Sequence, residues 1–414
     1  MLDNLLKTNM KVGNLEVDFG NGMRSSYGQG LAKASVHFHD KRAPAAIARD
    51  PQFALGQTYM DGRWSTDNLP ALITLLTQNF NHIKPTRLGP FGHLSRYFQQ
   101  LNRRVTSYRN VHHHYDLDEW LFRRFLDKDL HYSCAYFKEP GIDLEGAQRA
   151  KCRHIMHKLA LTPGQQVLDI GCGWGGLALF LAEHAGVHVT GLTLSQEQWR
   201  VAQQQAHMRG LSQRVNFLRE DYREHTGQYD RIVSVGMFEH VGVPYYVTFF
   251  NKINVLLKPK GVTLLHTIGR SGAPGKTNPW IQKYIFPGGY NPALSEVLLA
   301  LHKTNLIPTD IEVLRLHYSL TLAEWQRRFQ RHRAEVVTKL SERFARMWEF
   351  YLAACEAAFA AGELVVYQLQ LSNDVGALPL TRDYLYQAKA RSPVASNLFD
   401  AHIQPSSLGN SNHG

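Results

Sequence analysis

The stretch "VLDIGCGWGGLALFLAEHAG", residues 167–186, decides the fold of this chain. An apolar strand ends near Asp169, and Gly171, Gly173 and Gly175 follow at every second position before an apolar helix. A strand, a glycine turn and a helix in this order bring the backbone close to a nucleotide. The spacing differs from the dinucleotide fingerprint G-x-G-x-x-G with its later acid on the ribose.

The ligand of this turn is predicted from its charge. Asp169 places a carboxylate where a positively charged ligand would lie. S-adenosylmethionine, which carries a sulfonium and an α-amino group, suits that charge better than NAD does. The turn therefore predicts a methyltransferase.

Short strands alternate with helix-length segments beyond the turn, which predicts an α/β fold with a doubly wound parallel sheet. Residues 320–362 are strongly helical, and a strand-like segment, "LVVYQLQLS", follows them. The predicted strands are "VHVTGLTL" (187–194), "VNFLRED" (215–221), "YDRIVSVG" (229–236) and "VTLLHTIG" (262–269).

The domain organisation is predicted from composition. Residues 1–95 alternate like half-buried strands in "LEVDFGNGM" and "SVHFHD" and end in a helical pattern, which predicts a small α/β domain. Residues 96–111 are a basic linker, and residues 112–390 form the second domain. Residues 391–414 are polar and rich in glycine and serine, so we expect a disordered tail.

The chain is basic, with a formal net charge of +11. Residues 1–110 contain fourteen Lys/Arg and seven Asp/Glu, which gives this quarter of the chain a net charge of +7. A basic surface suggests nucleic acid or the anionic face of a bilayer as a partner, or only a well-solvated face. Charge alone does not choose between these interpretations.

Other features of the composition point to a cytoplasmic protein. No apolar run reaches the length of a membrane span, and the first residues lack the apolar core of a signal peptide. Four scattered cysteines without a CxxC pair suit a reducing compartment and argue against a zinc site or disulfides. Three adjacent histidines, 112–114, seldom give the geometry of a metal site, so no metal is predicted.

Several polar groups follow the predicted strands, where the carboxyl ends meet over the ligand crevice. "GLTLSQEQ" carries Thr193, Ser195 and Gln198 in place of an acidic residue, and Ser195-x-x-Gln198 is also a capping box for the next helix. Asp221 and Tyr222 follow the third strand and would form the adenine edge. Further motifs are "HYSCAYF" (131–137), "SVGMFEHVG" (234–242) and "LLHTIG" (264–269).

With "YIFPGGY" (284–290) and "HYSLTLAEW" (317–325), these motifs resemble the bacterial cyclopropane-fatty-acyl-phospholipid synthases and, more distantly, the mycolic acid cyclopropane synthases and methyltransferases. "LGQTYMDGRW" (55–64) resembles the small N-terminal domain of the full-length bacterial enzymes. The resemblance implies a class I methyltransferase Rossmann-like fold with helical acyl-binding insertions. The cofactor-binding residues that it implies are Tyr132, Ser133, Asp169, Gly171, Cys172, Gly173, Trp174, Gly175, Thr193, Leu194, Ser195, Gln198, Asp221 and Tyr222.

The resemblance also implies the reaction. A methylene group from S-adenosylmethionine is added to the cis double bond of an unsaturated acyl chain in a membrane phospholipid, with a bound bicarbonate ion as the base. The alternative is a methyltransferase that makes methyl-branched or methylene acyl chains without closing a ring. The implied catalytic residues are Cys134, Glu239, His266, Ile268, Tyr318 and Cys355. Because a small thiol on a helix is usually a core residue, Cys355 is also interpreted as a packing residue.

The implied partners are lipids. The N-terminal domain would dock reversibly on anionic headgroups, with residues 87–98 as a contact stretch, and the resemblance allows a homodimer.

A nucleic-acid methyltransferase is not favoured, because the Asn/Asp-Pro-Pro-Tyr/Phe motif and a Pro-Cys nucleophile are both missing. A non-catalytic lipid-binding protein is not favoured either, since the glycines and Glu239 are retained.

Overall fold

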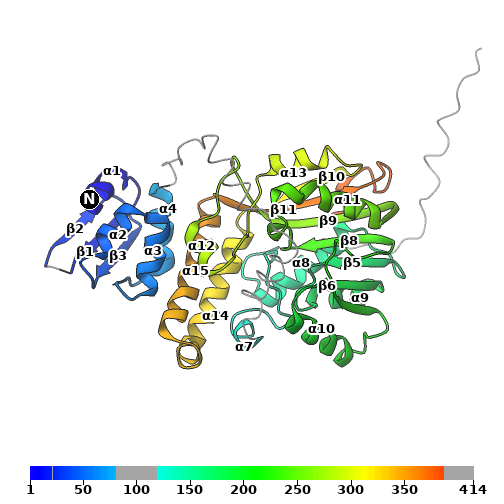
Figure 1. The fold of residues 1–414 in the computed structure, drawn as a ribbon, viewed down its shortest axis with the longest axis horizontal. Helices are drawn as coiled ribbons and strands as arrows, with labels where there is room; N and C mark the ends of the chain where they lie inside the picture. Colours follow the sequence, from blue (N-terminus) through cyan, green and yellow to red (C-terminus); the bar gives the residue numbers. More distant parts are fainter. Residues whose placement is uncertain (21, 81–118, 387–414) are drawn as a thin grey trace, which may run out of the picture.

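The computed structural model describes residues 1–20, 22–80 and 119–386, which form two sheets with a helical layer between them (Figure 1). The predicted linker (96–111), most of the predicted lipid-contact stretch (87–98), the three histidines and the predicted disordered tail lie outside the described residues. Among the described residues, no helix is long and apolar enough to cross a membrane.

The N-terminal unit is a four-stranded sheet in the order β2-β1-β3-β4, covered by helices. Strand β1 pairs antiparallel with β2 and parallel with β3, which confirms the predicted small α/β fold. Helix α3 begins after Asp50, whose side chain accepts a hydrogen bond from Phe53 N, with Pro51 in the first turn. The elements are α1 (Leu2–Asn9), β1 (Asn14–Asp18), β2 (Arg24–Tyr27), β3 (Lys33–Phe38), α2 (Ala43–Arg49), α3 (Pro51–Met60), β4 (Trp64–Ser65) and α4 (Leu69–Phe80).

The second sheet has seven strands in the order β10-β11-β9-β8-β5-β6-β7. The pairs from β9 to β7 are parallel, as predicted. The predicted doubly wound sheet is confirmed, and one edge of it is antiparallel, because β11 runs antiparallel to both β9 and β10. The strands are β5 (Gln166–Ile170), β6 (His188–Thr193), β7 (Val215–Arg219), β8 (Tyr229–Val235), β9 (Leu257–Arg270), β10 (Ile307–Val313) and β11 (Leu364–Ser372).

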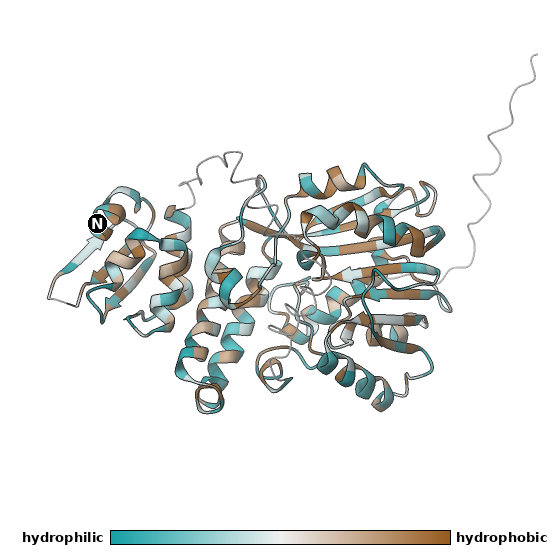
Figure 2. Ribbon diagram, in the orientation of Figure 1, coloured by the Kyte–Doolittle hydropathy of each residue, from teal (hydrophilic) through white to brown (hydrophobic). Residues whose placement is uncertain are grey.

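Helices cover both faces of this sheet. Val167 and Val189 pack with α8, α9 and α10, whereas Leu168 and Leu192 pack with α11 and α13, as side-chain alternation along a strand requires. Figure 2 shows the apolar character of these strands. The helices are α7 (Glu119–Phe122), α8 (Leu144–Lys158), α9 (Gly176–Ala185), α10 (Gln196–Met208), η1 (Phe238–His240), η2 (Val243–Tyr245), α11 (Tyr246–Leu256), α12 (Pro279–Tyr284), α13 (Leu294–Leu301), α14 (His317–Lys339), α15 (Glu342–Ala360) and η3 (Arg382–Leu385).

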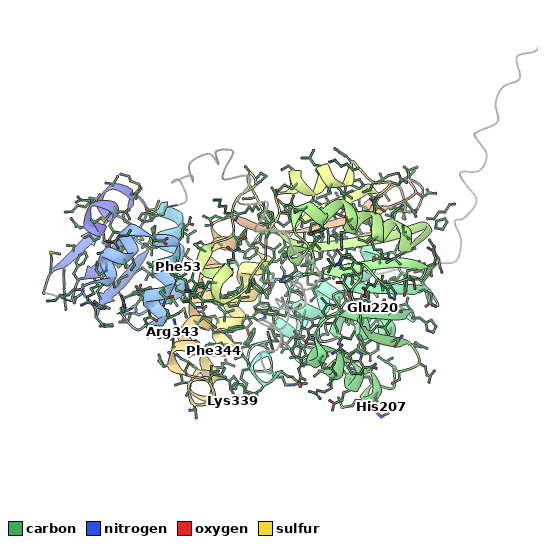
Figure 3. All side chains as sticks on the ribbon, in the orientation of Figure 1. Phe53, His207, Glu220, Lys339, Arg343 and Phe344 are labelled. Atoms are coloured by element: carbon green, nitrogen blue, oxygen red, sulfur yellow. The ribbon has the colours of Figure 1, made fainter. Side chains whose placement is uncertain are left out.

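The antiparallel pair α14 and α15 lies between the two sheets (Figure 1), and α15 packs against α3 and α4 of the N-terminal unit. The contact includes aromatic rings: the ring centroids of Tyr59 on α3 and Phe350 on α15 are 5.9 Å apart. Figure 3 shows Phe53 and Arg343 at this junction, where Arg343 Nε lies 3.1 Å from Asp61 Oδ1. One buried apolar cluster therefore runs from the N-terminal sheet into the helical layer.

Candidate functional site

A cavity of about 180 Å³ opens at the carboxyl ends of β5, β6, β7 and β8. This is the edge of a parallel sheet where ligands bind. All predicted cofactor residues except Gly175 and Ser195 line it: Tyr132, Ser133, Asp169, Gly171, Cys172, Gly173, Trp174, Thr193, Leu194, Gln198, Asp221 and Tyr222.

The glycine turn shapes the floor of this cavity. Gly171, Gly173 and Gly175 have φ values of +82°, +55° and +86°, in the left-handed region that favours glycine. A Cβ atom at Gly175 would meet Phe217 at 2.7 Å, so this glycine serves packing. A Cβ atom at Gly173 would meet no atom within 4 Å, because this position faces the cavity.

The predicted capping box after β6 forms only in part. Ser195 Oγ accepts a hydrogen bond from Gln198 N at 3.3 Å and caps α10. The Gln198 side chain does not return to the cap; its Oε1 accepts from Thr193 Oγ1 at 2.9 Å instead. This bond holds Gln198 at the cavity wall, so Ser195 acts indirectly by starting the helix that carries Gln198.

Charged groups lie at both ends of the cavity. Asp221 accepts a hydrogen bond from Arg223 Nε at 2.9 Å at the β7 end. Asp169 Oδ2, at the β5 end, is buried and has no hydrogen-bond partner among the described residues. Burial raises the pKa of Asp169 to about 7, although Lys151 and His131 oppose the shift. A cationic ligand would restore the charged form of this carboxylate.

The predicted catalytic residues lie outside the lining of this cavity, and Glu239 is the best defined of them. Its Oε1 accepts a hydrogen bond from Ile268 N at 2.6 Å. Its Oε2 is buried and has no hydrogen-bond partner within the described part of the chain. Burial raises the pKa of Glu239 to about 7, against hydrogen bonds from the backbone of Ile268 and Glu239 and from the Thr267 side chain. Near neutral pH, this carboxyl group can therefore carry a proton.

The raised pKa of Glu239 predicts a pH effect on stability. Between its ordinary pKa of 4.5 and the folded value of about 7, the folded chain holds a proton that the unfolded chain releases. The stability of the wild type relative to Glu239→Gln should therefore fall as pH rises from 4.5 to 7. Chemical denaturation of both proteins across this range tests the prediction, and a constant difference would contradict it.

Tyr318 on α14 connects this carboxyl group to other predicted residues. Tyr318 is buried, and its pKa is raised well above the ordinary value, first by burial and then by Tyr132, Cys134, Cys355 and Glu239. Tyr132 and Tyr351 hydroxyls are 2.7 Å apart. Tyr318 and Cys134 belong to one buried cluster, against which Tyr132 and Cys355 pack. Sequence reasoning missed Tyr351.

His266 on β9 is hydrogen-bonded to the neighbouring strand β11. Among the described residues, His266 Nδ1 is hydrogen-bonded to Gln368 Nε2 at 3.1 Å and no hydrogen bond joins it to Glu239. Burial and the positive charge of Lys151 lower the pKa of His266 to about 3, so the imidazole is neutral. Ile268, two positions further along β9, provides the contact to Glu239 through its backbone.

Sequence reasoning also missed Lys151 on α8. This fully buried side chain lines the cofactor cavity, and its Nζ donates to Ser133 Oγ at 3.0 Å. The helical spacing of Leu144, Ala147 and Ile155 could have placed it on the buried face of α8. Among the described residues, no three His, Cys, Asp or Glu side chains group as metal ligands.

The comparisons with known proteins agree with this geometry. The family model for mycolic acid cyclopropane synthetase matches residues 102–369, and a domain of unknown function matches residues 1–83. The chain is 40% identical over 352 residues to the cyclopropane-fatty-acyl-phospholipid synthase of Escherichia coli, covering 84% of this chain and 90% of that protein. It is 35% identical over 379 residues to the tuberculostearic acid methyltransferase UfaA1 of Mycobacterium tuberculosis, covering 85% and 88%.

Solved structures of cyclopropane synthases are also similar to this chain. The cyclopropane synthase MmaA2 from Mycobacterium tuberculosis superposes with a TM-score of 0.62 at 34% identity, covering 66% of this chain and 99% of that one. The mycolic acid cyclopropane synthase CmaA1 complexed with SAH and CTAB gives 0.61 at 33% identity, with the same coverage. The predicted class I methyltransferase fold is confirmed. The chain belongs to the cyclopropane synthase family of S-adenosylmethionine-dependent methyltransferases.

Proposed function

We propose that this protein transfers a methylene group from S-adenosylmethionine to the cis double bond of unsaturated acyl chains in membrane phospholipids and closes a cyclopropane ring. The similarity to the Escherichia coli synthase supports this substrate class. The observation that carries the proposal is the buried carboxyl group of Glu239, which lies in the same short helix as His240, a residue that lines the methyltransferase cavity.

The cavity fits S-adenosylmethionine in shape and charge. Gly173 leaves open space on its floor, and the buried Asp169 oxygen has no hydrogen-bond partner among the described residues. Thr193 and Gln198 offer polar atoms at the end of β6. When bound, S-adenosylmethionine would supply the one-carbon group as an electrophilic methyl on sulfonium.

Closing a ring requires a base, and we assign that role to a bicarbonate ion beside Glu239. A buried Glu239 with a pKa of about 7 can stay protonated and donate a hydrogen bond through Oε2 to a small anion. Tyr318 contributes a second hydroxyl whose burial keeps it protonated. These two groups would hold the anion while it accepts the proton released on ring closure.

Aromatic side chains would protect the positive charge that develops on the acyl chain. The ring of Tyr132 stacks on Trp325 at 5.2 Å, and Tyr318 packs on Phe359 at 4.7 Å. Electron-rich ring faces stabilise a cation, and a closely packed aromatic wall keeps water away from it.

The test is product analysis after incubation of the protein with S-adenosylmethionine and vesicles of a cis-monounsaturated phospholipid. Mass spectrometry should show the acyl chain heavier by one CH₂ group, and NMR should show the cyclopropane ring. A methyl-branched or methylene product would instead support the alternative reaction, to which the 35% identity with UfaA1 also points.

Replacing Cys355 by alanine should leave most of the activity. Burial raises the pKa of this thiol to about 12, so it stays protonated, and a nucleophilic cysteine needs the thiolate. We expect a loss of less than about tenfold, well short of the effect of removing a positioned acid–base group. Steady-state assays with Cys355→Ala check this, and complete inactivation with an intact fold would restore Cys355 as a catalytic residue.

We further propose that the protein associates reversibly with anionic membranes through the N-terminal unit. Segments 11–13 and 30–32 lie side by side, since Asn14 N donates to Ala32 O at 2.7 Å. They expose Val12 and Leu31 beside the basic chains of Lys11 and Lys33, and Leu31 is 100% exposed. Apolar side chains within a basic surface are typical of peripheral membrane contact.

Replacing Leu31 by serine should weaken binding to anionic vesicles, because the apolar insertion is lost. Binding of the wild type should also fall as salt rises, since the Debye length shortens to about 8 Å at physiological ionic strength. Leu380, which is 97% exposed at a distant site, provides the matched control Leu380→Ser. Vesicle sedimentation measures both effects; equal losses in the two variants would contradict this contact surface.

A further inference from the structure

Two ionisable side chains, Lys151 and Asp169, are buried at one end of the cofactor cavity without a described ion pair between them. Lys151 projects from α8, and Asp169 lies on the face of β5 that α8 covers, as its position two residues from Val167 requires. Both side chains are at most 1% exposed and both line the cavity.

The only described hydrogen-bond partner of the Lys151 ammonium is Ser133 Oγ, at 3.0 Å. No ion pair with a described carboxylate accompanies it. The neighbouring carboxylate of Asp127 is already occupied, because it accepts hydrogen bonds from His131 Nδ1 at 2.8 Å and from His131 N at 2.9 Å. Burial lowers the pKa of Lys151, and an anionic partner would favour the charged ammonium.

Lys158, the second buried lysine of α8, forms ion pairs with two carboxylates of the protein itself. Lys158 Nζ lies 3.2 Å from Asp310 Oδ2 and 2.6 Å from Glu312 Oε2, and it does not line the cavity. Lys151 faces the cavity instead, with donor capacity remaining on Nζ.

One cationic and one acidic side chain at the same end of the cavity match the amino-acid end of S-adenosylmethionine, which carries a carboxylate and an ammonium group. Strands β5, β6 and β7 are neighbours in that order, about 4.8 Å apart. The hydroxyl and amide groups of Thr193 and Gln198 and the Asp221–Tyr222 pair therefore face the nucleoside, whereas Lys151 and Asp169 face the other end of the ligand. We propose that Lys151 Nζ binds the α-carboxylate of the cofactor's amino-acid moiety, while Asp169 Oδ2 accepts hydrogen bonds from its α-ammonium group.

This inference rests on the proposed function only through the identity of the cofactor. It makes Lys151 a specificity determinant for the amino-acid end of the ligand. Ser133 is its positioning residue, and the backbone carbonyl of Ser133 is itself held by Gln148 Nε2 at 3.0 Å.

The test compares two ligands in Lys151→Met, a variant of similar length without charge. Calorimetry with S-adenosylhomocysteine should show affinity reduced by about 10- to 100-fold, the range expected for a lost hydrogen bond between charged groups. Decarboxylated S-adenosylhomocysteine, which keeps the amine, should bind the wild type and the variant with similar affinity. Equal losses for both ligands, or no loss for S-adenosylhomocysteine, would overturn the proposal.

Lys158→Met is the matched control. It should lower thermal stability, because Asp310 and Glu312 lose their buried cation, and it should leave the affinity for S-adenosylhomocysteine unchanged. If Lys151→Met does not fold, Lys151→Gln takes its place in the same two titrations. The wild type should also bind S-adenosylhomocysteine more tightly than the decarboxylated analogue.

Two further outcomes separate this inference from the proposed function. A protein that shows the predicted ligand dependence but makes no cyclopropane lipid would refute the proposed reaction and leave the role of Lys151 intact. If Lys151→Met instead loses only the response of activity to added bicarbonate, with unchanged affinity for S-adenosylhomocysteine, the cation belongs to the base pocket and the proposal fails.

Discussion

Replacing Glu239 by glutamine is expected to reduce cyclopropane formation by a factor of about 10² to 10⁴, the usual effect of one positioned acid–base group. The amide keeps the size of the side chain and can still accept the hydrogen bond from Ile268 N. Its NH₂ group can still donate a hydrogen bond to an anion, but the amide does not ionise, so it cannot give up a proton to the base and take it back. Methyl transfer should suffer less than ring closure, so branched or hydrated by-products should increase relative to cyclopropane.

The measurement is a product ratio by mass spectrometry and NMR, together with calorimetry of S-adenosylhomocysteine binding, which should be unchanged. Glu296→Gln is the matched control, because Glu296 is also buried but accepts hydrogen bonds from Tyr290 Oη at 2.7 Å and Ala293 N at 2.9 Å. Cyclopropane formation at the wild-type rate in Glu239→Gln would reduce this carboxyl group to a structural partner of β9.

Replacing Gly173 by valine is expected to weaken cofactor binding at least about 100-fold, a loss of roughly 3 kcal/mol. The new side chain would point into space that no protein atom within 4 Å occupies and that the cavity provides for the ligand. The φ of +55° also disfavours a β-branched residue, at a cost of roughly 1–2 kcal/mol in stability.

Gly210→Val separates these two effects. Gly210 has a φ of +65° and open space around its Cβ position, but it does not line the cavity. Both variants should lose similar stability in thermal melts, and only Gly173→Val should lose affinity for S-adenosylhomocysteine in calorimetry. Unchanged affinity in Gly173→Val would remove the glycine turn from the cofactor site.

Much of the fold could be predicted from local patterns. The parallel strands from β5 to β9 are segments with several buried apolar residues, and each lies where its sequence predicts it. The antiparallel edge could not be predicted, because β11 pairs with β9 across about a hundred residues of chain. Such pairing depends on which strand edge remains open after folding, and no local pattern reports it.

The sequence by itself determined the glycine turn, the polar strand ends and hence the class of cofactor. Each of these is written in one short segment whose backbone conformation follows from its own residue types. Only the tertiary structure decided which ionisable groups are functional. The raised pKa of Glu239 and the lowered pKa of Lys151 arise from burial by elements distant in sequence. Because desolvation depends on the whole packed environment, it appears only when α8, α14 and the sheet come together.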